Sequence, residues 1–303
     1  MAPPPYAGVG ERAWYYGFRF FCCLILAFLI LPIIIVVPLS FNVEPYFSFT
    51  EGMLALDPNA YSFRWYSDIF KNGMVDPKAD FGWAFIVDSW TNAQWLHSMR
   101  NSFFIAFFAT IIAATLGTLA ALGLSQSHLP MRNLIMGILI SPMIVPIIIT
   151  SCGLFFFYSD VGLSQTYTGV ILAHAILGVP FVVITVTATL IGFDRSLIRA
   201  ASNCGATPQT VFFKIIMPLI LPGVISGALF AFITSFDEVV AVIFLAGFEQ
   251  RTIPRQMWSG IREQISPTIL SVATILVCIS IMLLTTVELL RRRSEKLRGL
   301  SPG

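Results

Sequence analysis

Long runs without a charged side chain alternate with short charged segments along this sequence. Six runs stand out, and they cover residues 20–43, 101–131, 133–159, 161–193, 215–236 and 264–287. A helix needs about 20 apolar residues to cross the hydrocarbon core of a bilayer, and each run reaches that length. The runs are continuous in Leu, Ile, Phe, Val and Ala, whereas barrel strands alternate apolar with polar residues. The pattern therefore predicts an all-α, polytopic membrane protein with six transmembrane helices.

Composition supports the same class. Of the 303 residues, 56% are hydrophobic and 11% are charged, whereas soluble proteins carry about 25% charged residues. This excludes an ordinary soluble enzyme. We expect the lipid bilayer to surround the chain, and we expect no nucleic-acid partner. The five cysteines lie in or beside apolar runs and are expected to be free thiols.

The distribution of Lys and Arg predicts the orientation, because cytoplasmic segments are enriched in both. With the termini inside, eleven of these residues fall on the cytoplasmic side, and seven fall outside together with ten acids. We therefore expect both termini in the cytoplasm. The expected parts are a tail of residues 1–16, a transmembrane domain of residues 17–290 and a basic tail of residues 291–303. Two long connections lie within the domain, an outer loop over about residues 41–100 and a cytoplasmic loop over about residues 192–218.

Two adjacent acids, Asp237 and Glu238, directly follow the fifth run. An acid near the centre of a spanning helix costs roughly 2.5–3.5 kcal/mol. If the helix begins near Pro222, Asp237 lies in the outer third of the membrane. There the pair suits the passage of cations or hydrogen-bonding groups, and the alternative is that both acids simply reach interfacial water. Neighbouring residues on a helix are about 100° apart, so both acids face one pathway only if the helix breaks there.

Other polar and small residues in the runs predict packing features. Four small residues repeat at four-residue spacing on the fifth helix, which predicts close approach of another helix: Gly223, Gly227, Ala231 and Ser235. Three prolines predict kinks in the third and fourth helices: Pro142, Pro146 and Pro180. His174 lies in the fourth run, where we expect a packed, hydrogen-bonded side chain. A proton relay is the alternative.

Catalytic motifs are missing from the sequence. It contains no phosphate-binding G-x-x-x-x-G-K-[ST] loop, no G-x-S-x-G elbow and no H-E-x-x-H helix. The three histidines, His97, His128 and His174, are far apart. We therefore expect no catalytic residue, no metal site and no cofactor in this chain.

The cytoplasmic loop carries the most specific motif. It reads Arg199-Ala200-Ala201, then Gly205, then nine residues, then Ile215-Ile216-Met217-Pro218. This resembles the E-A-A-x-x-x-G-x9-I-x-L-P signature of permease subunits of bacterial type I ABC importers. Two short helices around a Gly-Ala-Thr-Pro turn would form a compact knob on the cytoplasmic face. By the resemblance, this knob docks on the ATPase through Arg199, Ala200, Ala201, Gly205, Ala206, Thr207, Pro208 and Pro218.

The resemblance also implies an assembly. It comprises an inner-membrane permease, a second permease of different sequence, a periplasmic binding protein, and a separate ATPase dimer that carries ATP and Mg²⁺. Arg199 stands where the signature has Glu, and we expect an acidic residue on the ATPase to face it.

Four segments are similar to the second permease of spermidine and putrescine importers. They begin at Phe63, Pro180, Gly192 and Ser235 and read FRWYS, PFVV, GFD and SFDE. The similarity implies a polyamine as substrate, with Trp65, Ser235, Asp237 and Glu238 along its pathway. Met143 follows Ser141-Pro142 where such permeases often carry an acid, and the outer loop before Phe63 is long. The alternatives are an importer of an opine, an amino-acid-like solute, a phosphonate or iron, and an ion-coupled secondary transporter.

Overall fold

A computed structural model describes residues 6, 8–126, 129–191, 193–194, 196–263 and 266–297. In these ranges the regular structure is helical, apart from an isolated antiparallel bridge between Asn42 and Tyr61. The predicted all-α class is therefore confirmed. The chain forms two compact units, one from residues 1–71 and 264–282 and the other from residues 72–263 and 283–303. His128, Gly192, Arg195 and residues 1–5, 7 and 298–303 of the two expected tails lie outside the described residues.

Five helical stretches in the described ranges are long and apolar enough to cross a membrane. They are α1 (Val9–Leu39), α5 (Gln94–Leu124), α8 (Tyr167–Ile191), the stretch Pro208–Asp237, and the Thr268–Thr286 part of α14 (Thr268–Leu297). A sixth candidate is the pair α6 (Arg132–Ile144) and α7 (Ile147–Asp160), which is bent by 98°. The third predicted run is therefore a broken pair of helices.

The break between α6 and α7 lies at Val145 and Pro146. Val145 has φ −70° and ψ 133°, the extended backbone that a following proline favours. Pro146 has no N–H with which to continue the helical hydrogen bonds. Pro142 and Pro180, by contrast, lie inside continuous helices. The predicted kink in the third run is confirmed at Pro146, where it is a full break.

The stretch Pro208–Asp237, which corresponds to the fifth predicted run, begins earlier than the expected start near Pro222. It consists of α10 (Pro208–Val211), the π-helical η2 (Phe212–Ile216) and α11 (Met217–Asp237). Pro218 lies in the first turn of α11, directly after η2, and Pro222 lies inside α11. The helix therefore runs through Pro222, and Asp237 is its last residue.

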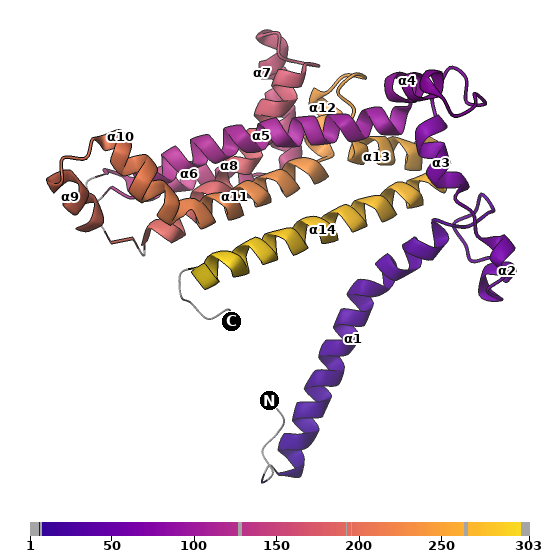
Figure 1. Cartoon of the computed structure of the whole chain (residues 1–303), viewed down its shortest axis with the longest axis horizontal. Coiled ribbons are helices and arrows are strands. Elements are labelled where there is room, and N and C mark those ends of the chain that lie inside the picture. The colour runs from indigo at the N-terminus through magenta and orange to yellow at the C-terminus, as the bar shows by residue number, and fades with distance from the viewer. Residues whose placement is uncertain are drawn as a thin grey trace. The chain divides into compact units, whose positions relative to one another are not determined.

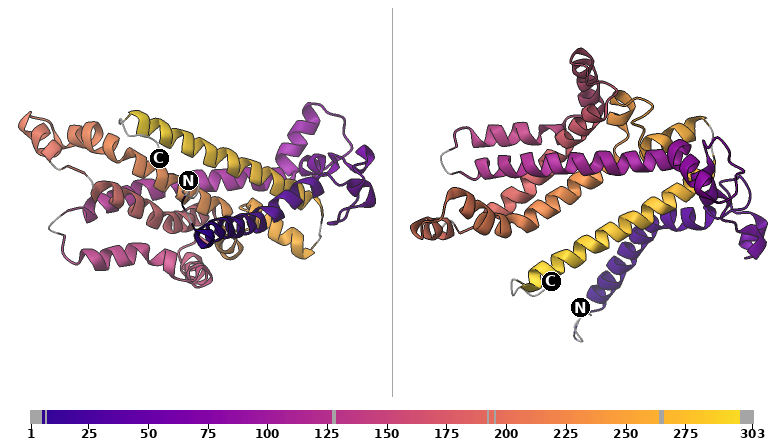
Figure 2. Two further views of the ribbon diagram at one scale, coloured as in Figure 1. Left: turned by 90° about the horizontal axis from the view of Figure 1, so that it is seen from below. Right: turned by 45° about the horizontal axis from the view of Figure 1, so that its top comes forward.

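The second unit is built around α5, α8 and α11, which lie side by side (Figures 1 and 2). The predicted stripe on α11 packs against α8. A Cβ atom on Gly227 would lie 2.7 Å from Cα of Val182, and a Cβ atom on Gly178 would lie 2.9 Å from that of Ala231. Real Cβ atoms do not approach so closely, so these positions require small residues. The predicted packing face is confirmed.

The two ends of this bundle carry different short helices. α9 (Ser196–Asn203) and α10 lie beyond one end of α8 and α11, and α13 (Ile253–Glu263) lies at the opposite end (Figures 1 and 2). α4 (Trp83–Asn92) precedes α5, and α12 (Val240–Leu245) follows α11.

The first unit contains α1, α2 (Glu51–Leu54), η1 (Pro58–Ala60), α3 (Arg64–Lys71) and the first part of α14. Asp57 caps η1, because its side chain accepts a hydrogen bond from the backbone N–H of Asn59. Ser271 donates to the backbone oxygen of Ser40 at 3.2 Å, and Thr268 donates to Asp68 at 2.6 Å. These bonds fasten α14 to the end of α1 and to α3.

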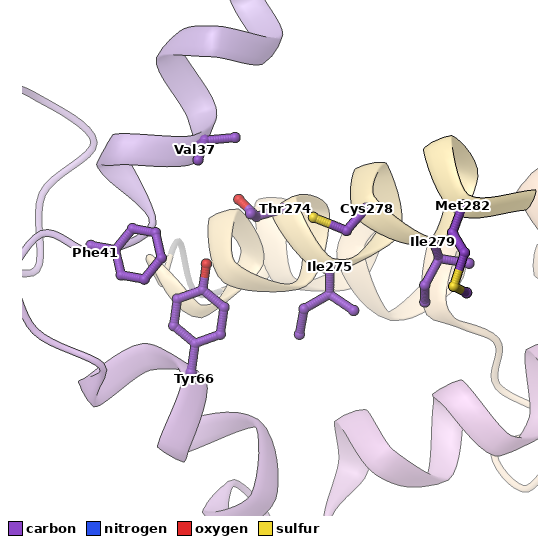
Figure 3. Close-up of a pocket in the computed structure, with 8 residues that line it drawn as sticks. All are labelled: Val37, Phe41, Tyr66, Thr274, Ile275, Cys278, Ile279 and Met282. Carbon is purple, nitrogen blue, oxygen red and sulfur yellow. The ribbon is translucent and has the colours of Figure 1, made fainter. Parts of the chain in front are cut away.

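An apolar hollow of about 460 Å³ lies within this unit. Phe41 and Tyr66 form one end, and successive turns of α14 form a wall that includes Thr274 and Cys278 (Figure 3). Its lining contains no acid or base. It therefore contains no side chain that is charged at neutral pH.

Candidate functional site

The predicted knob is present as α9, a turn and α10, and we call residues 196–211 the α9–α10 knob. Gly205 has φ +79°, a left-handed conformation that glycine adopts without strain. The Thr207 side chain caps α10 by accepting from the backbone N–H of Thr210. The sequence thus predicted the turn, and the structure adds the cap.

The α9–α10 knob presents a largely exposed surface. No residue of α9 is buried. Of the eight expected coupling residues, six are exposed and two are half-buried: Arg199, Ala200, Gly205, Thr207, Pro208 and Pro218 are exposed, and Ala201 and Ala206 are half-buried. The chain leaves these side chains accessible to a partner.

Asp194 fixes the start of this segment. The hydroxyl and the backbone N–H of Ser196 both donate to its carboxylate, at 2.6 and 2.8 Å. These bonds, with a smaller contribution from the nearby charge of Arg199, hold the pKa of Asp194 below its ordinary value. The carboxylate is therefore a stable anchor for the first turn of α9.

The acid pair lies at a break in the helix. Asp237 ends α11, and Glu238 has extended backbone with ψ 122°. The carboxylate of Glu238 accepts a hydrogen bond from the backbone N–H of Ala241 at 2.9 Å, in the first turn of α12. Asp237 is exposed and Glu238 is half-buried. Because the helix breaks here, the 100° separation of helical neighbours does not apply to the pair.

Ser235 lies two residues before Asp237 and is buried. Its hydroxyl shares a 2.8 Å hydrogen bond with Nδ1 of His174 on α8, which is also buried. The expectation of a packed, hydrogen-bonded His174 is confirmed. The sequence did not predict that Ser235 is its partner, since 61 residues separate the two.

Trp65 belongs to the first compact unit, whereas Ser235, Asp237 and Glu238 belong to the second. The indole ring is 7% exposed, and its N–H donates to the backbone oxygen of Asn42 at 2.7 Å. Trp65 and Ser235 thus both have buried partners within the chain. Their place in a substrate pathway stays a prediction.

A polar network that the sequence did not predict fixes the loop between α12 and α13. The side chain of Asn101, on α5, donates to the backbone oxygens of Glu249 and Arg251 at 2.6 and 3.0 Å. Arg255 donates to the backbone oxygens of Ala246 and Gly247, and burial lowers its pKa. Asn101, a polar residue at the start of an apolar run, was the only signal in the sequence, and it did not identify Glu249 and Arg251 as its partners.

Metal ligands do not gather in the described part of the chain. No group of three or more His, Cys, Asp or Glu side chains lies close enough there to hold a metal ion. Asp237, Glu238 and the α9–α10 knob can therefore supply hydrogen bonds and charge to a ligand or partner.

Comparison with known proteins agrees with this geometry. Residues 113–297 match the family described as binding-protein-dependent transport system inner membrane component. The chain is 30% identical to the spermidine/putrescine transport system permease protein PotC of Haemophilus influenzae over 91% of this chain and 96% of that protein. It is 28% identical to the putrescine transport system permease protein PotI of Escherichia coli K12, over 82% of this chain and 81% of that one.

Solved structures show the same fold. A bacterial ABC transporter involved in the import of the acidic polysaccharide alginate contains a chain that matches with a TM-score of 0.69 and 15% identity, over 94% of this chain and 99% of that chain. A chain of an amino acid ABC transporter matches with a TM-score of 0.51 and 18% identity, over 66% and 94%. The protein is thus a transport component with the fold of ABC transporter permeases, and it belongs to the family of inner membrane components of binding-protein-dependent transport systems.

Proposed function

We propose that this chain is the permease subunit of an ATP-driven importer of polyamines such as putrescine and spermidine. The observation that carries the proposal is similarity to polyamine permeases over nearly the full length of both chains. The acid pair at the break in α11 supports it, because a polyamine is a flexible polycation whose ammonium groups bind carboxylates.

In this proposal the two acids have different tasks. Asp237 is exposed and is free to meet an ammonium group of the passing substrate. Glu238 adds a second negative charge, and its hydrogen bond to the N–H of Ala241 fixes its position. Ser235 and Trp65 stabilise the structure rather than bind the substrate in this proposal, because each has a buried partner in its own unit.

The proposed topology has six spans, in which α6 and α7 together count as one. Both termini and the α9–α10 knob then face the cytoplasm, as the excess of Lys and Arg on that side indicates. The protein is placed in the bacterial inner membrane. Trp83–Asn92 and Ile253–Glu263 lie on the periplasmic side, where a binding protein would deliver the substrate.

ATP chemistry belongs to partner chains in this proposal. The sequence has no phosphate-binding loop, so ATP and Mg²⁺ bind to a separate ATPase dimer, and this subunit needs no cofactor. The exposed surface of the α9–α10 knob is the proposed contact. A second permease of different sequence completes the pathway, which runs between the two permeases.

Transport proceeds by alternating access. Closure of the ATPase dimer on ATP displaces the α9–α10 knob, and the knob is connected to α8 on one side and to α11 on the other. The two helices then move at their opposite ends, where α11 breaks at Asp237 and Glu238. This motion would expose the acid pair to each side of the membrane in turn.

ATP hydrolysis by the complete complex tests the substrate. The complex is reconstituted in liposomes with its binding protein and ATPase, and putrescine, spermidine and solutes of other charge are added in turn. We expect the two polyamines to stimulate hydrolysis. Stimulation by a phosphonate, an opine or iron would overturn the polyamine assignment and leave the importer class intact. Transport by the chain alone, driven by an ion gradient, would overturn the importer class.

A further inference from the structure

The contact between α8 and α11 is stepped, and each step joins one residue of the α11 stripe to a residue of α8. From the knob end, Gly223 packs against Thr189 and Gly227 packs against Thr185. Ala231 then packs against Gly178. The fourth member of the stripe, Ser235, hydrogen-bonds to His174. The stripe therefore holds α8 and α11 together from the knob to the break in α11.

The fourth step differs from the others in its chemistry. Thr185 donates its hydroxyl to backbone oxygens of Phe181 and Val182, and Thr189 donates to that of Thr185, so both hydroxyls bond within α8. His174 and Ser235, in contrast, form a hydrogen bond between the two helices. That bond has a direction and a preferred length, whereas apolar contacts between small residues are non-directional.

Helix packing alone does not explain a histidine at this position. His174 is 1% exposed, and its Nε2 atom has no hydrogen-bond partner in the described part of the chain. A buried nitrogen without a partner lowers stability relative to an apolar side chain of similar size. The bond through Nδ1 is therefore the contribution that only a polar side chain can make.

We propose that His174 is a positioning residue that locks α8 to α11 beside the helix break, so that movement of the α9–α10 knob reaches Asp237 and Glu238. The inference rests on the proposed importer function. Without the lock, the end of α11 can shift along α8 while the rest of the pair still follows the knob. ATP hydrolysis then continues without moving the acid pair.

Two substitutions distinguish the contributions of the two ring nitrogen atoms of His174. His174→Asn places a polar atom near the position of Nδ1, and His174→Gln places one near the position of Nε2. The readout is the number of ATP molecules hydrolysed per solute imported by the reconstituted complex. We expect His174→Gln to raise this ratio about fivefold, the equilibrium change that one hydrogen bond typically produces, and His174→Asn to restore most of the wild-type ratio. Because the ratio is taken over assembled complexes, a loss of folded protein does not change it.

A double-mutant cycle tests whether Ser235 is the partner. Ser235→Ala should raise the ratio as much as His174→Gln does, and the double variant should raise it no further. The matched control is Thr187→Val, which removes another buried polar group of α8 whose hydroxyl has no partner in the described residues. We expect Thr187→Val to leave the ratio unchanged. Equal ratios for His174→Asn and His174→Gln, or additive effects of His174 and Ser235, would overturn the proposal.

The wild-type complex distinguishes this inference from the proposed substrate. If polyamines fail to stimulate hydrolysis and another solute succeeds, the polyamine assignment is wrong, and the ratio is measured for that solute. His174→Gln should still raise it. If polyamines are imported and His174→Gln leaves the ratio at the wild-type value, the substrate assignment stands and the role of His174 is refuted.

Discussion

The indole N–H of Trp65 donates a hydrogen bond to the backbone oxygen of Asn42 at 2.7 Å, and both residues are buried. Asn42 in turn holds the turn that follows α1, because its side chain donates to the backbone oxygens of Tyr46 and Ser48 and accepts from the N–H of Glu44. Tryptophan has a single polar donor. Here that donor fastens α3 to the turn that follows α1.

Trp65→Phe should therefore destabilise the first unit without changing substrate affinity. The buried oxygen of Asn42 loses its donor, which costs about 1–3 kcal/mol, and the smaller phenyl ring leaves a cavity that adds to this cost. The thermal midpoint of the purified complex and the KM for putrescine uptake measure the two effects. Trp14→Phe is the matched control, because Trp14 lies in the same unit, is 76% exposed and should change neither value when it is replaced. A raised KM with an unchanged midpoint would place Trp65 in the pathway.

Asp237→Asn should raise the KM for putrescine. A hydrogen bond to a charged group is worth about 1.5–3 kcal/mol, so removal of the charge should raise KM roughly tenfold or more. The folded structure should persist, because Asp237 is exposed at the end of α11. Uptake kinetics over a range of putrescine concentrations provide the measurement. An unchanged KM in a fully assembled complex would contradict the proposed contact with the substrate.

Glu238 has two tasks that two substitutions separate. Glu238→Gln removes the charge and keeps an oxygen that can accept from the N–H of Ala241. Glu238→Ala removes both and should lower stability by about a further 1 kcal/mol. We expect both variants to slow putrescine uptake and only Glu238→Ala to lower the thermal midpoint. Equal midpoints for the two variants would argue against a structural role for the hydrogen bond.

Arg199→Glu should weaken binding of the ATPase. Arg199 is exposed on the α9–α10 knob, and reversing its charge opposite an acidic partner replaces attraction with repulsion, which we expect to cost roughly tenfold or more in affinity. Co-purification of the ATPase with the permease, at several salt concentrations, measures the effect. Arg132→Glu is the control, because Arg132 is exposed at the start of α6 and does not belong to the α9–α10 knob. Full co-purification of the ATPase with the Arg199→Glu variant would contradict the expectation that an acidic residue of the ATPase faces Arg199.

Local patterns predicted the long helices and the knob, because both depend on residues close in sequence. Charge-free runs identify spans, and the Gly-Ala-Thr-Pro segment from Gly205 to Pro208 identifies a turn. No proline or glycine lies near the helix break after Asp237, so the sequence does not predict it. The chain then continues as α12 in an apolar segment, and Glu238 accepts a hydrogen bond from its first turn. The bond between Trp65 and Asn42 joins residues 23 positions apart, and that between His174 and Ser235 joins residues 61 apart. Such pairs depend on tertiary packing, which composition and spacing do not determine.

Acid should loosen the loop before α4. Asp88 accepts hydrogen bonds from the N–H groups of Asp76 and Val75 and from the side chain of Asn92. These bonds, that of Asp76 first, lower the pKa of Asp88. Its contribution to stability is present above the unfolded pKa of about 3.9 and is lost as the pH falls through the lower folded value. Hydrogen exchange at Val75 and Asp76, corrected for intrinsic rates, should therefore accelerate as the pH falls through the folded pKa of Asp88.

Asp88→Asn tests this assignment directly. An amide has one acceptor oxygen, so it cannot accept at two atoms as the carboxylate does. Exchange at Val75 and Asp76 should be faster than in wild type at neutral pH, without the additional acid-dependent step. Asp80→Asn is the control, because Asp80 is exposed in the same loop. A persistent acid-dependent step in Asp88→Asn would assign it to another group.

Gly227→Ala should break the contact that joins α8 to α11. The added Cβ atom would lie 2.7 Å from Cα of Val182 and would overlap the hydroxyl of Thr185. Backbone atoms cannot move aside as a side chain can, so the helices must separate, at a cost of typically 1–3 kcal/mol. Gly153→Ala on α7 is the control, because its Cβ atom would meet nothing within 4 Å, and alanine in a helix should stabilise by about 0.5–1 kcal/mol. The two variants should thus shift the thermal midpoint in opposite directions, and a shared direction would mean that α11 does not depend on its small residues.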